Sequence, residues 1–248
     1  MALPELRPAW TSRRAGSPGV QPVPARHHPL GELEITYVSE LGAGRLDDLA
    51  TRVRLWKSWG MCQRHALGFL AVEASIEDGW LFQAAVLYAE IMERAEHALA
   101  RHWFLERARA EANLQGDGCP LCAVGLTTDR AAPPDAARRV AAGSRLEVLQ
   151  AMASNTRVHW SAWVCGSCDG SGSGVRCRLH LAEELRVGLP VDLVGHRARV
   201  REIARRVDAY RASFGWSQRG SGTLADEAAL IGAVGWCSGW GAILEWLT

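Results

Sequence analysis

The chain has 248 residues, of which 48% are hydrophobic, and a formal net charge of +1 at pH 7. This length and hydrophobic content are sufficient for one large domain or two small ones with real cores. The near-zero net charge argues against a protein that binds polyelectrolytes through its overall charge. No segment approaches the ~20 continuous apolar residues that span a bilayer.

The N-terminal segment predicts a disordered or loosely docked arm over residues 1–30. It is rich in Pro, Gly, Arg and Ser, shows no apolar periodicity and lacks the apolar region of a secretory or twin-arginine signal. We therefore expect a cytoplasmic protein with no membrane segment. The seven cysteines are then expected to be metal ligands or reactive thiols rather than disulfides.

Apolar residues recur at helical spacing beyond the arm, which predicts a mostly α-helical protein. Residues 30–41 are compatible with either a short strand or the start of a helix. One face of the next expected helix carries Leu46, Leu49, Val53 and Trp56. Another helix is expected to begin at Cys62, and a long one to run over residues 79–114 until Gly-Asp-Gly ends it.

Glycine and proline divide the second half of the chain. A knuckle at residues 119–122 is followed by a loop, because two consecutive prolines exclude helix there. Helix resumes over residues 136–155, and the sequence DGSGSG at 169–174 predicts a flexible turn. A helix is expected to begin at Cys177. A long arginine-rich helix and a final apolar helix or helix pair follow it.

The expected fold is an irregular multi-helix bundle in which zinc knuckles (Cys-x2-Cys) are joined to helix starts (Cys-x2-His). After the arm we expect an N-terminal helical repeat over residues 31–115 and a cysteine-rich second repeat over 116–190. C-terminal helices are expected over 191–248. Residues from about 31 to 248 are expected to form one compact unit.

Six of the seven cysteines lie in pairs with a two-residue gap, and two histidines complete the pairs. The pairs are Cys62 and His65, Cys119 and Cys122, Cys165 and Cys168, and Cys177 and His180. A two-residue gap lets both side chains converge on one ion where the backbone turns tightly. Eight ligands predict two closed Cys3His zinc sites. An iron–sulfur cluster is the main rival centre, but the two histidines favour zinc.

Two groupings of these pairs are compatible with the spacing. The first places Cys165, Cys168, Cys177 and His180 on one ion and Cys62, His65, Cys119 and Cys122 on the other. The second joins Cys119 and Cys122 to Cys177 and His180, and Cys165 and Cys168 to Cys62 and His65. Loop closure favours the first grouping, because the eight-residue spacer between Cys168 and Cys177 costs little entropy to close.

The segments GMCQRHALGFLAVE, CPLC and VRCRLHLAEEL, with VLYAEIMERAEHAL after the first, resemble an uncharacterised bacterial family of unknown function. That family carries tandem repeats of a CPxC knuckle followed by a G-[FL]-C-x-x-H helix start. The resemblance spans roughly residues 45–245 and implies a helical fold and zinc, but no activity. The CGSC pair at 165–168 is an addition to the pattern. If it supplies ligands that the first repeat lacks, the resemblance favours the second grouping.

Closed, thiolate-rich zinc sites are typically structural, so we expect a binding, adaptor or regulatory role with a protein partner. The alternative is a metal- or thiol-dependent enzyme of specialised metabolism that acts on a small molecule. Its catalytic group would be an open zinc position or Cys237, the one cysteine outside the pairs. A lone cysteine in an apolar helix is, however, more often a small buried hydrophobe.

A further alternative is nucleic-acid binding through an arginine stripe. Arg197, Arg201 and Arg205 lie at four-residue steps and so share one helix face that could meet phosphate groups. The competing interpretation is a solvated face on which these cations pair with neighbouring acids such as Glu202 and Asp208. The near-zero net charge favours the second interpretation.

Overall fold

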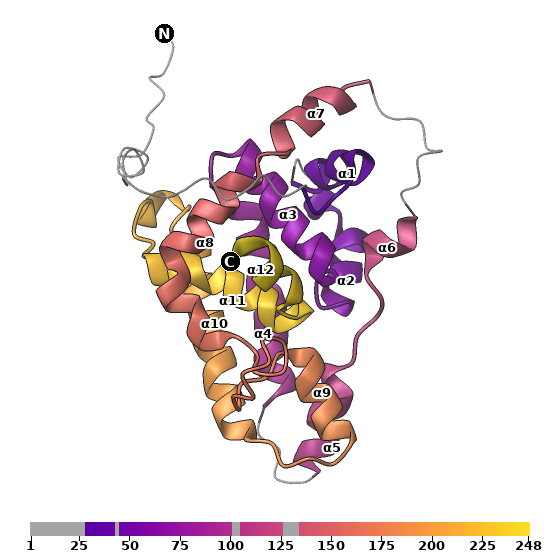
Figure 1. Cartoon of the computed structure of the whole chain (residues 1–248), viewed down its shortest axis with the longest axis vertical. Helices are drawn as coiled ribbons and strands as arrows, with labels where there is room; N and C mark the ends of the chain where they lie inside the picture. Colours follow the sequence, from indigo (N-terminus) through magenta and orange to yellow (C-terminus); the bar gives the residue numbers. More distant parts are fainter. Residues whose placement is uncertain (1–27, 43–44, 101–104, 126–133) are drawn as a thin grey trace.

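A computed structural model of the chain describes residues 28–42, 45–100, 105–125 and 134–248. The described residues form helices and no strand, which confirms the predicted class. Most of the expected arm, residues 1–27, lies outside the described residues. In chain order (Figure 1) the elements are α1 (Glu32–Gly42), η2 (Arg45–Asp47), α2 (Leu49–Lys57), α3 (Gln63–Ile76), α4 (Phe82–Ala98), α5 (Glu106–Leu114), α6 (Pro120–Val124), α7 (Ala136–Gly143), α8 (Leu146–Trp160), η3 (Ser161–Trp163), α9 (Arg178–Arg186), α10 (Leu193–Ala212), η4 (Trp216–Gln218), α11 (Leu224–Ser238) and α12 (Gly241–Leu247).

Helix α11 lies at the centre of the molecule, in contact with α3, α4, α8, α9 and α10. All of its residues from Asp226 to Ser238 are buried, as expected for a helix that is apolar on every side. Thr223 and Asp226 form a capping box that begins the helix. Buried apolar residues from α1 through α12 form one core around it.

Large tryptophans fill this core where glycines leave room for them. The rings of Trp160 and Trp240 stack with their centroids 5.9 Å apart, and Trp59 meets Trp236 edge to face at 5.8 Å. A Cβ atom at Gly235 would lie 2.4 Å from the Trp240 ring, so only glycine admits the ring at this position. These close approaches bring α8, α11 and α12 together.

The expectation of one long helix over residues 79–114 is wrong. Helix α4 ends at Ala98, and α5 begins at Glu106 after Leu105, which adopts the left-handed conformation with φ of 54°. Arg197 of α10 spans the break, because it donates to the Leu99 carbonyl and forms an ion pair with Glu106. The turn lets α5 pack against α9. Tertiary contacts therefore end a helix that local periodicity would continue.

The helix expected over residues 136–155 is likewise divided, into α7 and α8. The Ser75 hydroxyl of α3 donates to the Ala142 carbonyl and accepts the Arg145 N–H, with an N···O distance of 3.1 Å. Gly143 also packs so close to Ile35 that a Cβ atom would lie 2.9 Å from it. The chain turns where α3 supplies these partners.

The apolar face expected around α2 is only partly buried. Leu46 lies in the core, but Leu49 is 73% exposed, Val53 40% and Trp56 42%, and α2 reaches the core through Leu55. Residues 32–42, which the sequence left open between strand and helix, form α1. In the part of the chain that the structure describes, no helix is both long and apolar enough to cross a bilayer.

Candidate metal centres

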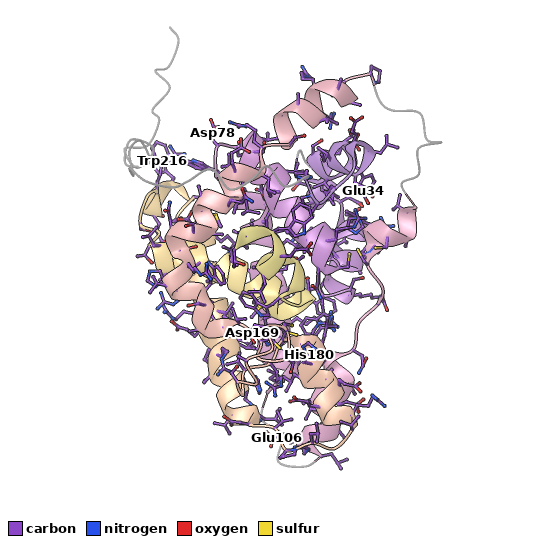
Figure 2. The ribbon with its side chains drawn as sticks, in the orientation of Figure 1. Glu34, Asp78, Glu106, Asp169, His180 and Trp216 are labelled. Carbon is purple, nitrogen blue, oxygen red and sulfur yellow. The ribbon has the colours of Figure 1, made fainter. Side chains whose placement is uncertain are left out.

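The eight paired cysteines and histidines gather in two clusters, and in each cluster four ligand atoms lie within 4.8 Å of one another. Centre 1 comprises Cys62, His65, Cys119 and Cys122, and centre 2 comprises Cys165, Cys168, Cys177 and His180. This is the first of the two groupings that the spacing allows. The centres occupy separate parts of the molecule in Figure 2, where Glu34 marks the neighbourhood of centre 1 and His180 belongs to centre 2.

Centre 1 joins the starts of two helices that are distant in the sequence. Cys62 is the N-cap of α3, which places His65 in the first helical turn on the same side as the thiol. Cys119 is the N-cap of α6, where Pro120 occupies the first helical position and preorganises the turn. Cys122 then lies one turn along α6. Its helix ends at once, because Gly125 adopts the left-handed conformation with φ of 56°.

Centre 2 is built from one short segment. Cys177 is the N-cap of α9 and His180 lies in its first turn, which repeats the arrangement of Cys62 and His65. The Cys165–Cys168 turn is closed by the Cys168 N–H, which donates to the Cys165 carbonyl at 2.9 Å. The Gly166 N–H donates to the Val175 carbonyl at 2.9 Å, so the glycine-rich turn is tied back to the knuckle.

The distances within each cluster match a tetrahedron around one ion. Zinc with Zn–S bonds of about 2.3 Å and a Zn–N bond of about 2.0 Å has S···S edges of about 3.8 Å and S···N edges of about 3.5 Å. In centre 1 the three sulfurs lie 3.2, 3.5 and 3.4 Å from His65 Nδ1, and Cys62 lies 3.8 Å from Cys122. In centre 2 the corresponding distances to His180 Nδ1 are 3.2, 3.4 and 3.3 Å, with 3.9 Å between Cys168 and Cys177. The donor sets can therefore hold metal ions.

The electrostatics of the sulfurs also favour a cation. A hydrogen bond from Cys62 lowers the pKa of the Cys119 thiol, which favours a thiolate at this position. Hydrogen bonds from Cys168 and Cys177 likewise lower the pKa of Cys165. The remaining thiols are disfavoured from ionising beside these anions unless a positive charge joins the cluster.

Glu34 of α1 orients the imidazole of centre 1. Its carboxylate accepts a hydrogen bond from His65 Nε2 at 2.9 Å, which directs the Nδ1 lone pair toward the three sulfurs. Arg64 and the Gly31 N–H also donate to Glu34, at 2.7 and 2.9 Å. Burial raises the pKa of Glu34, but the hydrogen bonds from Arg64, Gly31 and His65 lower it to about 2. The carboxylate is thus a fixed anion behind the ligand.

Sequence reasoning missed Glu34 and Arg64. Glu34 lies 31 residues before His65 and belongs to a segment whose secondary structure the sequence did not decide. The available signal was Arg64 itself, a charged residue between two ligands at the start of an apolar helix. This signal is weak, because the Arg64 side chain is half exposed and a solvated cation needs no fixed anion.

Cys237 lies at the C-terminal end of α11 and is fully enclosed. Its sulfur is 3.9 Å from the Met92 sulfur, and burial raises the pKa of the thiol to about 12. A thiol that stays protonated and has no path to solvent is a packing residue rather than a nucleophile. The buried interpretation of Cys237 is the one that its surroundings favour.

The arginine stripe on α10 is partly neutralised. Arg197 is largely buried and pairs with Glu106, and Arg205 pairs with Glu202 at 3.0 Å. Arg201 is exposed. Two of the three cations therefore belong to ion pairs within the chain, as the solvated-face interpretation expects.

Comparisons of this chain with protein-family models, curated proteins and solved structures found no match.

Proposed function

We propose that the chain is a zinc protein whose two Cys3His centres are structural and whose role is to bind another protein, as an adaptor or regulator. The observation that carries this proposal is the tetrahedral geometry of both clusters, in which protein atoms supply every vertex. A structural zinc site has four protein ligands, whereas a catalytic site keeps one position for water or substrate. Three thiolates also donate enough charge to make the ion a weak Lewis acid.

The first test is the metal content of protein purified without a metal-binding tag. We expect about two zinc ions per chain and few reactive thiols in the folded protein, because the paired sulfurs bind metal and Cys237 is buried. Chelation should release thiols in step with zinc. Iron, or a single ion per chain, would contradict the proposal.

Cobalt(II) substitution tests whether the centres are closed. Tetrahedral cobalt with three thiolates gives intense visible bands, and these bands should not change when azide or imidazole is added, because no position is open. A spectrum that shifts on addition of either ligand would identify an open centre. The enzyme alternative would then replace the binding role.

A further inference from the structure

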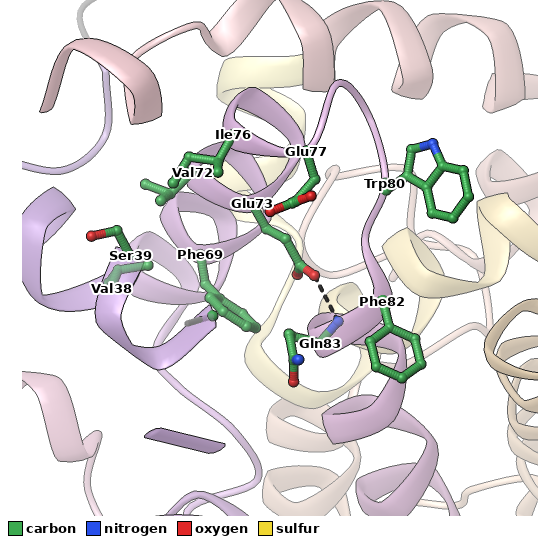
Figure 3. A pocket seen from close by; sticks show the side chains of 11 residues that line it. Val38, Ser39, Phe69, Val72, Glu73, Ile76, Glu77, Trp80, Phe82 and Gln83 are labelled. Carbon is green, nitrogen blue, oxygen red and sulfur yellow. Dashed lines mark hydrogen bonds between the residues drawn. The ribbon is translucent and has the colours of Figure 1, made fainter. Parts of the chain in front are cut away.

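A cavity of about 280 Å³ lies at the C-terminal end of α3, which is the end remote from centre 1. Its walls come from α1, from the C-terminal half of α3 and from the residues that begin α4, and its lining includes Val72, Phe69, Trp80 and Phe82 (Figure 3). Ligand pockets span roughly 300–1,000 Å³, so this cavity suits a single aromatic ring with a short side chain.

Two carboxylates enter this apolar cavity. In Figure 3 the carboxylates of Glu73 and Glu77 lie between Phe69 on one side and Trp80 and Phe82 on the other. None of the described lining residues is a lysine, arginine or histidine. The charge that the cavity offers is therefore entirely negative, which disfavours an anionic ligand.

Glu73 is fixed at the cavity wall by the backbone of α4. Its two carboxylate oxygens accept the N–H groups of Gln83 at 2.6 Å and Ala84 at 2.9 Å, at the positive end of the helix. Each oxygen retains a further lone pair for another donor. Burial raises the pKa of Glu73 to about 8, so without a ligand this carboxyl is mostly protonated at pH 7, and a bound cation would favour its ionised form.

The aromatic wall of the cavity packs against further aromatic rings behind it. Phe214, after the end of α10, packs against Trp80 with ring centroids 5.3 Å apart and against Phe82 at 5.5 Å. Tyr210 braces Phe214 in turn, at 5.0 Å. Indole and phenyl faces attract cations, and a preformed wall reduces the entropy lost on binding.

We propose that this cavity is a binding site for a small organic cation, an ammonium group attached to an aromatic or branched apolar body. The ammonium lies between the carboxylates of Glu73 and Glu77, and the apolar body packs against Phe69, Trp80 and Phe82. The site shares no residue with either metal centre. Its occupant could therefore regulate the protein without exchanging with zinc.

Calorimetry with 2-phenylethylammonium tests this proposal, with the neutral 2-phenylethanol as its matched control. We expect saturable binding of one ammonium ion per chain and about tenfold weaker affinity for the alcohol, because its single neutral O–H replaces three charged N–H donors. Equal affinity for the two compounds, or no saturable binding of the ammonium ion, would overturn the proposal.

Charge reversal at the cavity rim separates binding from folding. Glu77 is exposed, so the Glu77→Lys variant should fold normally. Its affinity for the ammonium ion should fall by at least about tenfold, because the new lysine repels the like charge of the ligand. Glu93→Lys on the exposed face of α4 is the matched control and should not change the affinity. An unchanged affinity in Glu77→Lys would contradict the site.

Glu73→Gln tests the buried carboxyl. We expect weaker ammonium binding with unchanged zinc content, whereas a purely structural cap for α4 would leave the affinity unchanged. We would also measure the zinc content of every variant, so that failure of the cation-site proposal can be distinguished from failure of the zinc proposal.

Discussion

The two centres use the same ligand set, three cysteines and one histidine, but they connect parts of the chain that lie at very different separations in the sequence. Centre 1 joins residues that are 54 to 60 positions apart in the sequence, so a bound ion would link the start of α3 to α6. Centre 2 spans only 15 positions and organises the glycine-rich segment from which it is built. By loop-closure entropy alone, a cross-link at centre 1 would contribute about 1 kcal/mol more than one at centre 2.

The burial of the cysteine ligands, in contrast, indicates that centre 2 contributes more to stability than centre 1. Cys165 and Cys177 of centre 2 are fully buried, whereas Cys122 of centre 1 is exposed. The segment before Cys177 is mostly glycine and serine, so it has few apolar contacts of its own once its ion is lost. We infer that centre 1 fastens elements that are already folded, and that centre 2 is required for its own segment to fold.

The largest expected effect is the loss of centre 2 in Cys177→Ser. Zinc at about 1,000 times its Kd stabilises a fold by about 4 kcal/mol, and this variant should lose stabilisation of that order. Cys122→Ser should cost about half as much, because water can reach the exposed position. Denaturant unfolding and zinc content measure both variants. If Cys122→Ser lowers the free energy of unfolding more than Cys177→Ser does, loop-closure entropy contributes more to the stability than the burial of the ligands.

The second effect tests whether the knuckle of centre 2 depends on close backbone contact. A Cβ atom at Gly166 would lie 2.4 Å from the Ser173 backbone, so Gly166→Ala should open the turn. We expect the free energy of unfolding to fall by about 2 kcal/mol and the zinc content to fall by one ion per chain. Gly170→Ala is the matched control in the same turn. Its φ is 73° but no atom lies near its Cβ position, so about 1 kcal/mol of backbone strain is expected without loss of zinc.

These local features were the ones that the sequence predicted best. The helix starts at Cys62 and Cys177 follow from a ligand pair placed before an apolar helix, and both occur in the structure. The grouping of the pairs also follows the loop-closure argument rather than the family resemblance. Short-range geometry depends on a few neighbouring residues, and a single sequence contains that information.

Features that depend on distant partners could not be predicted. The break after Ala98 depends on Arg197, and the break between α7 and α8 depends on Ser75. Exposure of Leu49 and Val53 depends on which other helices reach α2. Glu34 acquires its role only when α1 packs beside α3. Each of these requires the tertiary arrangement, which periodicity does not contain.

A smaller effect is expected from the carboxylate behind centre 1. Glu34→Gln removes the charge that orients His65, and loss of such a partner typically weakens metal affinity by about 10- to 100-fold. Glu32→Gln, on the exposed face of the same helix, is the matched control. Competition with a zinc chelator measures the affinity of each centre. Equal weakening of both centres would refute the specific role of Glu34.

The smallest effect concerns a bridge between the centres. Arg178 directly follows Cys177 of centre 2. It donates to the Leu114 carbonyl at 2.8 Å and lies 5.3 Å from the Trp59 ring. Trp59 in turn donates to the Gln115 carbonyl at 2.8 Å, which anchors the segment leading to Cys119. The first turn of α9 therefore supports the approach to centre 1.

Arg178→Met nearly keeps the length of the side chain but removes its hydrogen bonds to the Leu114 and Cys237 carbonyls. We expect zinc affinity at centre 1 to fall by a factor of about 3 to 5, since a typical net hydrogen bond contributes about 1 kcal/mol. Arg186→Met, exposed near the end of the same helix, should change neither centre. If Arg178→Met lowers the zinc affinity of centre 2 alone, the two centres are independent, and the ligands of centre 1 are positioned only by the helices that carry them. If it weakens centre 1, a local fold organised by one ion helps to position the ligands of the other.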